Sequence, residues 1–225
     1  MKKHLKRLPA PKTWMINRNK NKFILRARPG QKKNLSLPLG LIIRDFLQFT
    51  STMSEVKKLL NTKEVLVDGQ RRKDHHFMVG LFDVIIFKDL KQQYRLSLDN
   101  QGRLIPKEIS ALENNLKPCK IIGKSTVAQG KIQYHLHDGK NIFMKEKAAV
   151  GDTVLLTLPQ LEVQEVLPLK PEMMVFLTQG KHSGDFGKIK EIKAQEVQYT
   201  IDKRTVETAK KYAFIVGEKK AAITL

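Results

Sequence analysis

The sequence is poor in cysteine, in aromatic residues and in long apolar runs. It has one cysteine, Cys119, and aromatic residues make up 7% of its 225 residues. A single cysteine excludes an intramolecular disulfide framework and any metal site built from several cysteines, and it favours a reducing, intracellular setting. The longest apolar runs, at 39–43 and 84–87, are far shorter than the roughly 18 residues that a membrane span needs. We therefore expect no membrane-spanning segment.

Acidic residues are missing from the N-terminal part of the chain. Residues 1–33 contain twelve Lys and Arg and no Asp or Glu, within a chain whose formal net charge is +20. A block of this kind repels itself and usually becomes ordered on an anion. Nucleic acid is the anion that the charge favours, because the block lacks the amphipathic face that binding to an acidic lipid surface requires. It also lacks the apolar region of a secretory signal, so we interpret it as part of the mature protein.

Residues 38–91 predict two helices followed by two strands. Pro38 suits a first helical position, and the apolar residues at 39, 42, 43, 46 and 47 follow a period of 3.6. Thr52 and Glu55 have the spacing of a capping box at the start of a second helix. A strand over 64–67 leads into the turn dipeptide Asp68-Gly69, and a second strand covers 83–87.

From residue 94 onward, short strands separated by turns predict an all-β region. The expected strands are 94–98, 103–105, 119–124, 131–136, 141–144, 153–158 and 162–166, with a short helix over 111–116 that Ser110 and Glu113 would cap. A last group covers 173–178, 188–192, 196–201, 204–208 and 214–216, with a glycine-rich loop at 179–187. Five such strands suit a small closed barrel. The expected fold class is multi-domain, part α+β and part all-β.

Cationic residues concentrate on the predicted helices and on the turn between the strands. They are Arg44, Lys57, Lys58, Arg71, Arg72 and Lys73. Guanidinium groups bridge phosphates bidentately and lysines add point charge, so such a face can clamp a folded RNA. The alternative is a solvated helix face, which we prefer for Lys57 and Lys58 taken alone. For residues 71–73 beside the acid-free block, we prefer RNA contact.

Residues 37–47, 55–60 and 63–74 strongly resemble the RNA-binding domain named after ribosomal protein S4. The segments 4–8, 10–12, Trp14, 79–85, 116–121, 136–142 and 151–153 extend the likeness, so that nearly the whole chain is similar to the small-subunit ribosomal protein family S4e of archaea and eukaryotes. The long insertions of eukaryotic members are missing, which favours the archaeal type. Residues 174–184 with Gly187 resemble a KOW motif on an SH3-like barrel, although Gln179 replaces a glycine that the family usually has.

The resemblance implies a structural, non-catalytic constituent of the small ribosomal subunit in the cytoplasm. Its partners would be 16S-type rRNA and neighbouring ribosomal proteins, with no cofactor, metal, small-molecule substrate or membrane. The implied domains are a basic rRNA-binding segment at 1–37, an S4-type RNA-binding domain at 38–91, a central β domain at 92–170 and a KOW SH3-like barrel at 171–225. We expect the basic segment to thread between RNA helices and to become ordered only when RNA surrounds it.

Fifteen residues are the predicted RNA contacts. They are Lys6, Arg7, Lys12, Trp14, Arg26, Arg28, Lys33, Arg44, Lys57, Lys58, Arg71, Arg72, Lys73, Lys181 and His182. Trp14 either stacks on a base or anchors the basic segment to the protein. Gly180, Gly184 and Gly187 would allow positive φ and close approach of loop amides to a phosphate.

Two rival functions belong to other classes. The first is an RNA-modifying enzyme, because the same RNA-binding domain is fused to pseudouridine synthases; the nearest approach to their catalytic aspartate is Arg95 with Asp99, at the wrong spacing. The second is a free regulator that uses the KOW barrel. The pairs His75-His76 and His135 with His137 suggest a metal only weakly, because few further ligands are available. Cys119 fits a buried strand better than a nucleophile.

Overall fold

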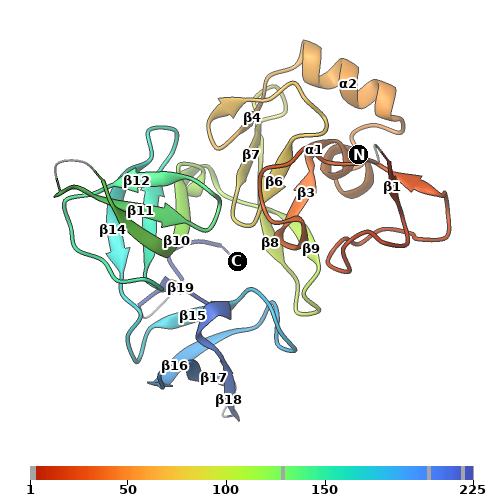
Figure 1. The fold of residues 1–225 in the computed structure, drawn as a ribbon. Helices are drawn as coiled ribbons and strands as arrows, with labels where there is room; N and C mark the ends of the chain where they lie inside the picture. The colour runs from red at the N-terminus through yellow and green to blue at the C-terminus, as the bar shows by residue number, and fades with distance from the viewer. Residues whose placement is uncertain (1–3, 128–129, 202–203, 219–220, 225) are drawn as a thin grey trace. The chain divides into compact units, whose positions relative to one another are not determined.

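The computed structural model describes residues 4–127, 130–201, 204–218 and 221–224 (Figure 1). The chain forms two compact units. The first contains the residues up to Leu98 together with Arg103–Asn114, and the second contains Asp99–Gly102 and the residues from Asn115 onward. In the described residues, no helix has both the length and the apolar character for a membrane span.

The first unit is built on a five-stranded antiparallel sheet. Its order is β5 (Gln70–Arg71), β4 (Val65–Val67), β7 (Val84–Phe87), β8 (Gln92–Leu98) and β9 (Leu104–Glu108). Two small sheets pair β1 (Leu5–Lys6) with β2 (Phe23–Ile24) and β3 (Ser36–Pro38) with β6 (Met78–Gly80). The helical elements are η1 (Lys33–Leu35), α1 (Leu39–Leu41), η2 (Ile42–Phe46), α2 (Met53–Thr62) and η3 (Ala111–Glu113).

The helix predicted after Pro38 is present, but most of it is a π-helix. α1 continues directly into η2, in which the Leu47 N–H donates to the Ile42 oxygen at 2.9 Å, five residues back. Ile42 and Ile43 are fully buried, in agreement with the apolar stripe of the sequence. The wider turn then places Arg44 and Asp45 outside this buried stripe.

The capping box and the hairpin turn are confirmed. The Glu55 N–H donates to Thr52 Oγ1, and the Glu55 carboxylate accepts from the Thr52 and Ser51 N–H groups, so α2 begins where the sequence predicts. Between β4 and β5, Asp68 and Gly69 both have positive φ, 51° and 75°, as a type I′ turn requires. Asp68 Oδ1 also accepts from the Val84 N–H at 3.1 Å, which ties the turn to β7.

The five-stranded sheet crosses the boundary expected between residues 91 and 92. Residues 92–95 of β8 pair with β7, and β9 pairs with β8. A strand that follows its neighbour after a short turn completes an antiparallel hairpin, so tertiary pairing assigns 92–98 and 104–108 to the first unit.

The helix predicted at 111–116 is a single 3-10 turn, Ala111–Glu113, without a side-chain cap from Ser110. The reason is that Glu113 has another partner, since Arg95 Nη1 donates to its carboxylate at 3.1 Å and Nη2 donates to its carbonyl oxygen at 2.9 Å. Arg95 is fully buried, so this contact fixes the turn against β8.

The second unit contains two five-stranded antiparallel sheets. The first has the order β12 (Asn141–Phe143), β11 (Ile132–Leu136), β10 (Leu116–Thr126), β13 (Thr153–Thr157) and β14 (Glu162–Leu167). The second has the order β18 (Arg204–Ala209), β17 (Glu196–Ile201), β16 (Phe186–Ile192), β15 (Met174–Leu177) and β19 (Ala213–Gly217). A 3-10 turn, η5 (Lys210–Tyr212), precedes β19. The strands predicted after residue 116 are confirmed, and Cys119 is a buried residue of β10.

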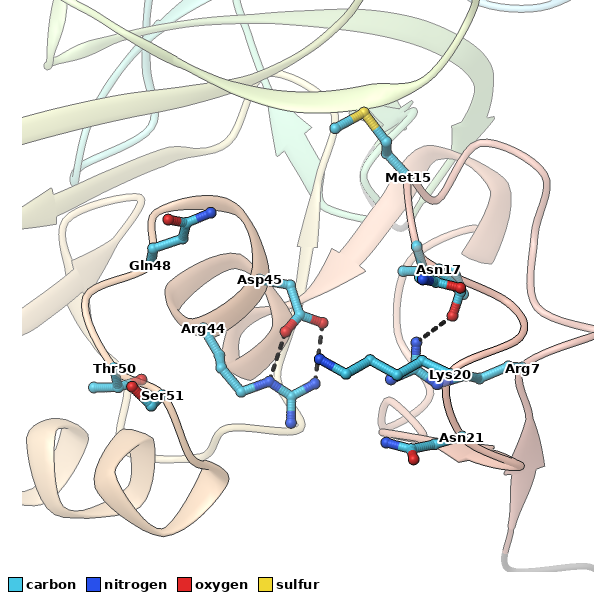
Figure 2. Close-up of a pocket in the computed structure, with 11 residues that line it drawn as sticks. Arg7, Met15, Asn17, Lys20, Asn21, Arg44, Asp45, Gln48, Thr50 and Ser51 are labelled. Atoms are coloured by element: carbon cyan, nitrogen blue, oxygen red, sulfur yellow. Dashed lines mark hydrogen bonds and ion pairs between the residues drawn. The ribbon is translucent and has the colours of Figure 1, made fainter.

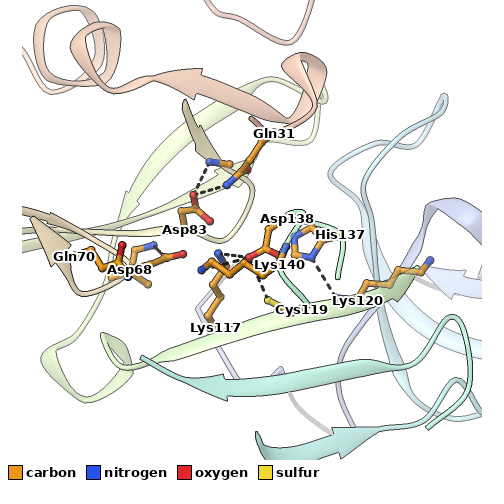
Figure 3. A network of polar contacts seen from close by, with 12 residues as sticks. Gln31, Asp68, Gln70, Asp83, Lys117, Cys119, Lys120, His137, Asp138 and Lys140 are labelled. Atoms are coloured by element: carbon orange, nitrogen blue, oxygen red, sulfur yellow. Dashed lines mark hydrogen bonds and ion pairs between the residues drawn. The ribbon is translucent and has the colours of Figure 1, made fainter. Parts of the chain in front are cut away.

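A buried ion pair closes the hairpin between β11 and β12 (Figure 3). Lys117 Nζ lies 3.0 Å from Asp138 Oδ2, and the two side chains are 0% and 1% exposed. Lys140 Nζ lies 3.5 Å from the same oxygen. Burial by itself raises the pKa of Asp138, but the charges of Lys117, His137 and Lys140 outweigh burial and lower this pKa to about 2. The carboxylate is therefore ionised at neutral pH.

Asp138→Asn is expected to lower the free energy of unfolding at pH 7 by about 1.5–3 kcal/mol, because charged hydrogen bonds are removed from a buried place. Since the folded pKa of Asp138 is about 2 and its ordinary value is 3.8, the contribution is complete above about pH 4 and is lost as the pH falls toward 2. Urea unfolding at pH 7 and pH 3 measures both effects. Asp89→Asn, which removes an exposed ion pair with Lys63, is the matched control and should cost less than about 1 kcal/mol. Equal costs for the two variants would contradict the assignment.

Candidate nucleic-acid interface

The N-terminal segment, residues 4–37, is held in its fold by contacts to its own backbone carbonyl oxygens. The Arg18 guanidinium donates to the carbonyl oxygens of Arg7, Leu8, Ala10 and Pro11 at 2.8–3.2 Å. β1 and β2 pair within the same segment. Protein acceptors thus satisfy Arg18 in place of phosphates. That the segment becomes ordered only when RNA surrounds it stays a prediction.

Trp14 anchors the segment to the first unit. Its side chain is 3% exposed, and the indole N–H donates to the Ser36 oxygen at 2.9 Å and lies 3.2 Å from the Lys33 oxygen. The attachment to the rest of the first unit is a parallel bridge between Trp14 and Leu104, the first residue of β9, whose N–H donates to the Thr13 oxygen at 2.8 Å. Lys33 and Ser36 belong to the N-terminal segment itself. Of the two roles considered from the sequence, the structure shows the anchor. Trp14 is withdrawn from the predicted RNA contacts because its ring is covered.

Contacts around His76 join the N-terminal segment to the chain between β5 and β6. Arg28 Nε lies 2.6 Å from Asp74 Oδ2, and the Arg28 N–H donates to the His76 oxygen at 2.9 Å. His76 Nδ1 lies 2.5 Å from the Arg26 oxygen. Arg26 is half-buried and Arg28 is exposed, so this junction presents the guanidinium of Arg28 at the surface.

The charges that act on His75 show that α2 lies near the same junction with the N-terminal segment. Burial lowers the pKa of His75, and the charges of His76, Lys57 and Arg28 lower it further, against the opposite effect of Asp74. Lys57 and Arg28, which are distant in the sequence, thus act on one imidazole. Burial and the positive charges of both segments thus act in the same direction on the pKa of His75.

The β4–β5 hairpin adds the next cations. Arg71 Nη2 donates to the Asn61 oxygen at 3.3 Å, one helical turn beyond Lys57 on α2. The half-buried Arg72 places its guanidinium 4.3 Å from the centre of the Phe77 ring, and Lys73 is exposed. The name cationic surface is used below for Arg28, Lys57, Arg71, Arg72 and Lys73. Lys57 lies on α2 and Arg71 on β5, whereas Arg28, Arg72 and Lys73 lie in loops. Their separation in the sequence does not reveal that the fold brings them together.

The other predicted lysines of the first unit lie outside the cationic surface. Lys58 occupies the next position of α2, and Lys6, Lys12 and Lys33 lie along the N-terminal segment. Each is exposed and accessible to a phosphate. The structure does not bring these four lysines together at one place.

Arg7 and Arg44 face a polar cavity of about 630 Å³. Arg7 is 7% exposed and its Nη1 donates to the Asn17 oxygen at 2.7 Å. Arg44 forms a bidentate pair with Asp45, at 2.6 and 3.0 Å, and this hydrogen bonding raises the pKa of Arg44. Lys20, Asn21 and Gln48, which help to complete the cavity, were not predicted from the sequence. In the sequence, Lys20 and Asn21 are marked only by the polar run at 17–22, and such a run does not show which part of the fold it lies against.

Lys181 and His182 lie in the second unit, on the loop between β15 and β16. Lys181 is exposed, and His182 Nδ1 lies 3.3 Å from Asp185 Oδ2. Gly184 has a φ of 92°, but a Cβ there would collide with the Asp99 oxygen, so this glycine serves packing against the 99–102 turn. Gly187 does not have positive φ, contrary to the expectation; a Cβ would collide with the Thr200 oxygen of β17.

The residues considered for catalysis or metal binding have structural partners. Arg95 is bonded to Glu113, and Asp99 Oδ1 accepts from the Gln101 N–H at 2.9 Å within a turn. His135 lies 2.8 Å from Asn141 Oδ1 and 3.0 Å from Ser125 Oγ. Over the described part of the chain, no group of three or more His, Cys, Asp or Glu side chains is placed to hold a metal ion.

Comparison with known proteins gives consistent matches. The model of Ribosomal family S4e matches residues 90–163, and that of the RS4NT (NUC023) domain matches residues 1–31. Small ribosomal subunit protein eS4 of Archaeoglobus fulgidus is 38% identical over 222 residues, which cover 96% of this chain and 94% of the relative. Its counterpart in Methanocaldococcus jannaschii is 37% identical over 241 residues, covering 100% of this chain and 98% of the relative. The crystal structure of the 30S ribosomal protein S4e from Thermoplasma acidophilum matches with a TM-score of 0.73 at 27% identity, covering 82% of this chain and 96% of that chain.

The single tryptophan allows a direct test of the anchor role. If Trp14 is buried against Ser36, iodide should not quench its fluorescence in the folded protein, and addition of RNA should leave its intensity unchanged. The control is the chain unfolded in concentrated urea, in which iodide should quench freely. Quenching on addition of RNA, as base stacking produces, would contradict the anchor.

Proposed function

The chain belongs to ribosomal family S4e, and on this premise we propose that it is a structural constituent of the small ribosomal subunit that binds and organises small-subunit rRNA. The observation that carries the RNA-binding part is the cationic surface. It joins cations from the N-terminal segment, α2 and the β4–β5 hairpin, three parts of the chain that only the fold brings together.

Phosphate neutralisation and shape recognition are the proposed mechanism. Lys57 lies on the capped helix α2 and Arg71 on β5 beside the hairpin turn, so regular structure sets the positions of these two cations, as recognition of a structured RNA by its backbone requires. The Arg28 pair with Asp74 uses one edge of a guanidinium whose side chain is 72% exposed, which leaves the rest of the group accessible to a phosphate.

We propose for the second unit a KOW SH3-like barrel at 171–225 and a central β domain before it. Five antiparallel strands over 174–217, with Lys181 and His182 on the β15–β16 loop, support the barrel. In the first unit we propose a basic segment at 1–37 and an S4-type RNA-binding domain from residue 38, whose sheet extends through β9. The proposed partners are 16S-type rRNA and adjacent ribosomal proteins on the cytoplasmic ribosome, without cofactor or catalysis.

Salt dependence of RNA binding tests the mechanism. With six to ten phosphate contacts, the slope of the logarithm of the binding constant against the logarithm of salt concentration is expected to be roughly −4 to −9 on a small-subunit rRNA transcript. The combined variant Lys57→Gln, Arg71→Gln and Lys73→Gln should make the slope less steep by roughly 0.7–0.9 for each phosphate that is no longer neutralised. Filter binding over a salt series measures both values.

The matched control removes three exposed lysines of the second unit, by Lys131→Gln, Lys145→Gln and Lys147→Gln, with the same change in net charge. Its slope should change less. A wild-type slope near zero, or equal changes in the two variants, would overturn the role of the cationic surface.

Sedimentation of native lysate tests the ribosomal assignment itself. We expect the protein to travel stoichiometrically with the small subunit through a sucrose gradient and to remain there at moderate salt. A free or substoichiometric pool would favour the regulator or the RNA-modifying enzyme. In that case, Asp99→Asn with a search for one missing rRNA modification would separate those two.

A further inference from the structure

The cavity between the N-terminal segment and η2 is a concave polar site apart from the cationic surface (Figure 2). Its volume is about 630 Å³, within the range of pockets that hold small molecules. Its lining comes from two stretches of the first unit, residues 7–21 and 44–51. The two stretches form its opposite walls (Figure 2).

Two buried polar atoms at this cavity lack a hydrogen-bond partner in the protein. Arg7 is 7% exposed and its Nε makes no hydrogen bond, although Nη1 is held by the Asn17 oxygen. On the opposite wall, Thr50 Oγ1 is also buried and unsatisfied. Both side chains belong to the lining of the cavity, so each wall leaves part of its hydrogen-bonding capacity unused within the protein.

The charges of the cavity favour an anion with a hydrogen-bonding edge. Arg7, Lys20 and Arg44 are positive, and Asp45 alone among the lining residues is negative. Figure 2 shows Arg44 and Lys20 projecting into the space between the two walls. Asp45, Asn21 and Gln48 add carboxylate and amide groups of the kind that read the edge of a base.

Arg44 and Asp45 lie on a backbone segment of rare conformation that packing holds in place. η2 is a π-helical turn, a conformation that is rare and often found at functional sites. It is followed by Gln48 with a φ of 55°. Phe49 then packs edge to face against Phe87 at 5.0 Å, and its N–H donates to the Ile43 oxygen. The strained segment is thus fixed by packing, so the cavity exists before any ligand binds.

We propose that this cavity binds a single unstacked ribonucleotide of an RNA chain, with the phosphate at Arg7, Lys20 and Arg44 and the base edge at Asp45 and Gln48. A paired nucleotide cannot enter, since its base edge is occupied and its neighbours are stacked; a bulged nucleotide can be turned out of the helix. The inference rests on the proposed RNA-binding function and adds recognition of an extruded nucleotide to the sequence-independent binding of phosphates.

The test compares RNA hairpins that differ only in a bulge. The full chain, labelled with ¹³C at the methionine methyl groups, is titrated with four hairpins that carry one bulged A, C, G or U, with the parent hairpin without a bulge, and with inorganic phosphate. We expect the Met15 methyl signal to shift with at least one bulged hairpin and to stay in place with the parent. Binding should favour that bulged hairpin by roughly tenfold or more. Equal shifts and affinities for bulged and parent hairpins, or saturation of the same shift by phosphate alone, would overturn the proposal.

Variants that each lack one positive charge distinguish binding in this cavity from binding to the cationic surface. Lys20→Gln and Arg44→Gln should reduce the preference for the bulged hairpin by roughly tenfold, with unchanged Trp14 emission as the check that the chain is folded. Lys57→Gln should weaken both hairpins by the same factor, and Lys145→Gln should change neither. An unchanged preference in Lys20→Gln would exclude the cavity while leaving the proposed function intact; failure of the wild type to bind any hairpin would instead refute the proposed function.

Discussion

Backbone carbonyl oxygens are the partners of two cations, Arg18 and Lys120, that tie distant parts of each unit together. Arg18 binds four carbonyl oxygens of the acid-free N-terminal segment. In the second unit, Lys120 Nζ donates to the carbonyl oxygens of Lys210, Lys211 and Ala213, which ties β10 to the chain before β19. Carbonyl oxygens satisfy hydrogen-bond donors without cancelling their charge. The protein can therefore fold at a net charge of +20 and keep the positive field that an RNA partner requires.

The first unit contains the two sites that we propose for RNA. The cationic surface spreads fixed positive charge over α2 and the hairpin, which suits phosphates without regard to sequence. The cavity beside η2 is concave, and it pairs cations with a carboxylate and amides, which suits one nucleotide. Phosphate contacts position an RNA and base contacts specify it, so the two sites would serve complementary purposes.

Local features were predictable because their causes lie within a few residues. The capping box of Thr52 and Glu55, the Asp68-Gly69 turn and the strands after residue 116 all appear where the sequence places them. The predictions that the structure corrects depend on partners that are distant in the sequence. Ser110 and Glu113 have the spacing of a capping box, yet Arg95 engages Glu113 instead.

The sequence alone determined the charge, the secondary-structure pattern and the family resemblance, because each depends on residue types and short spacings. Only the tertiary structure decided that Trp14 is covered by Ser36, that β8 and β9 extend the sheet of the first unit, and that Arg28 and Lys57 act on the same imidazole. It also decided that Arg7 and Arg44 share a cavity with Lys20. These outcomes depend on which distant residues meet, and a side chain's role as anchor or RNA contact follows from whether the fold buries it.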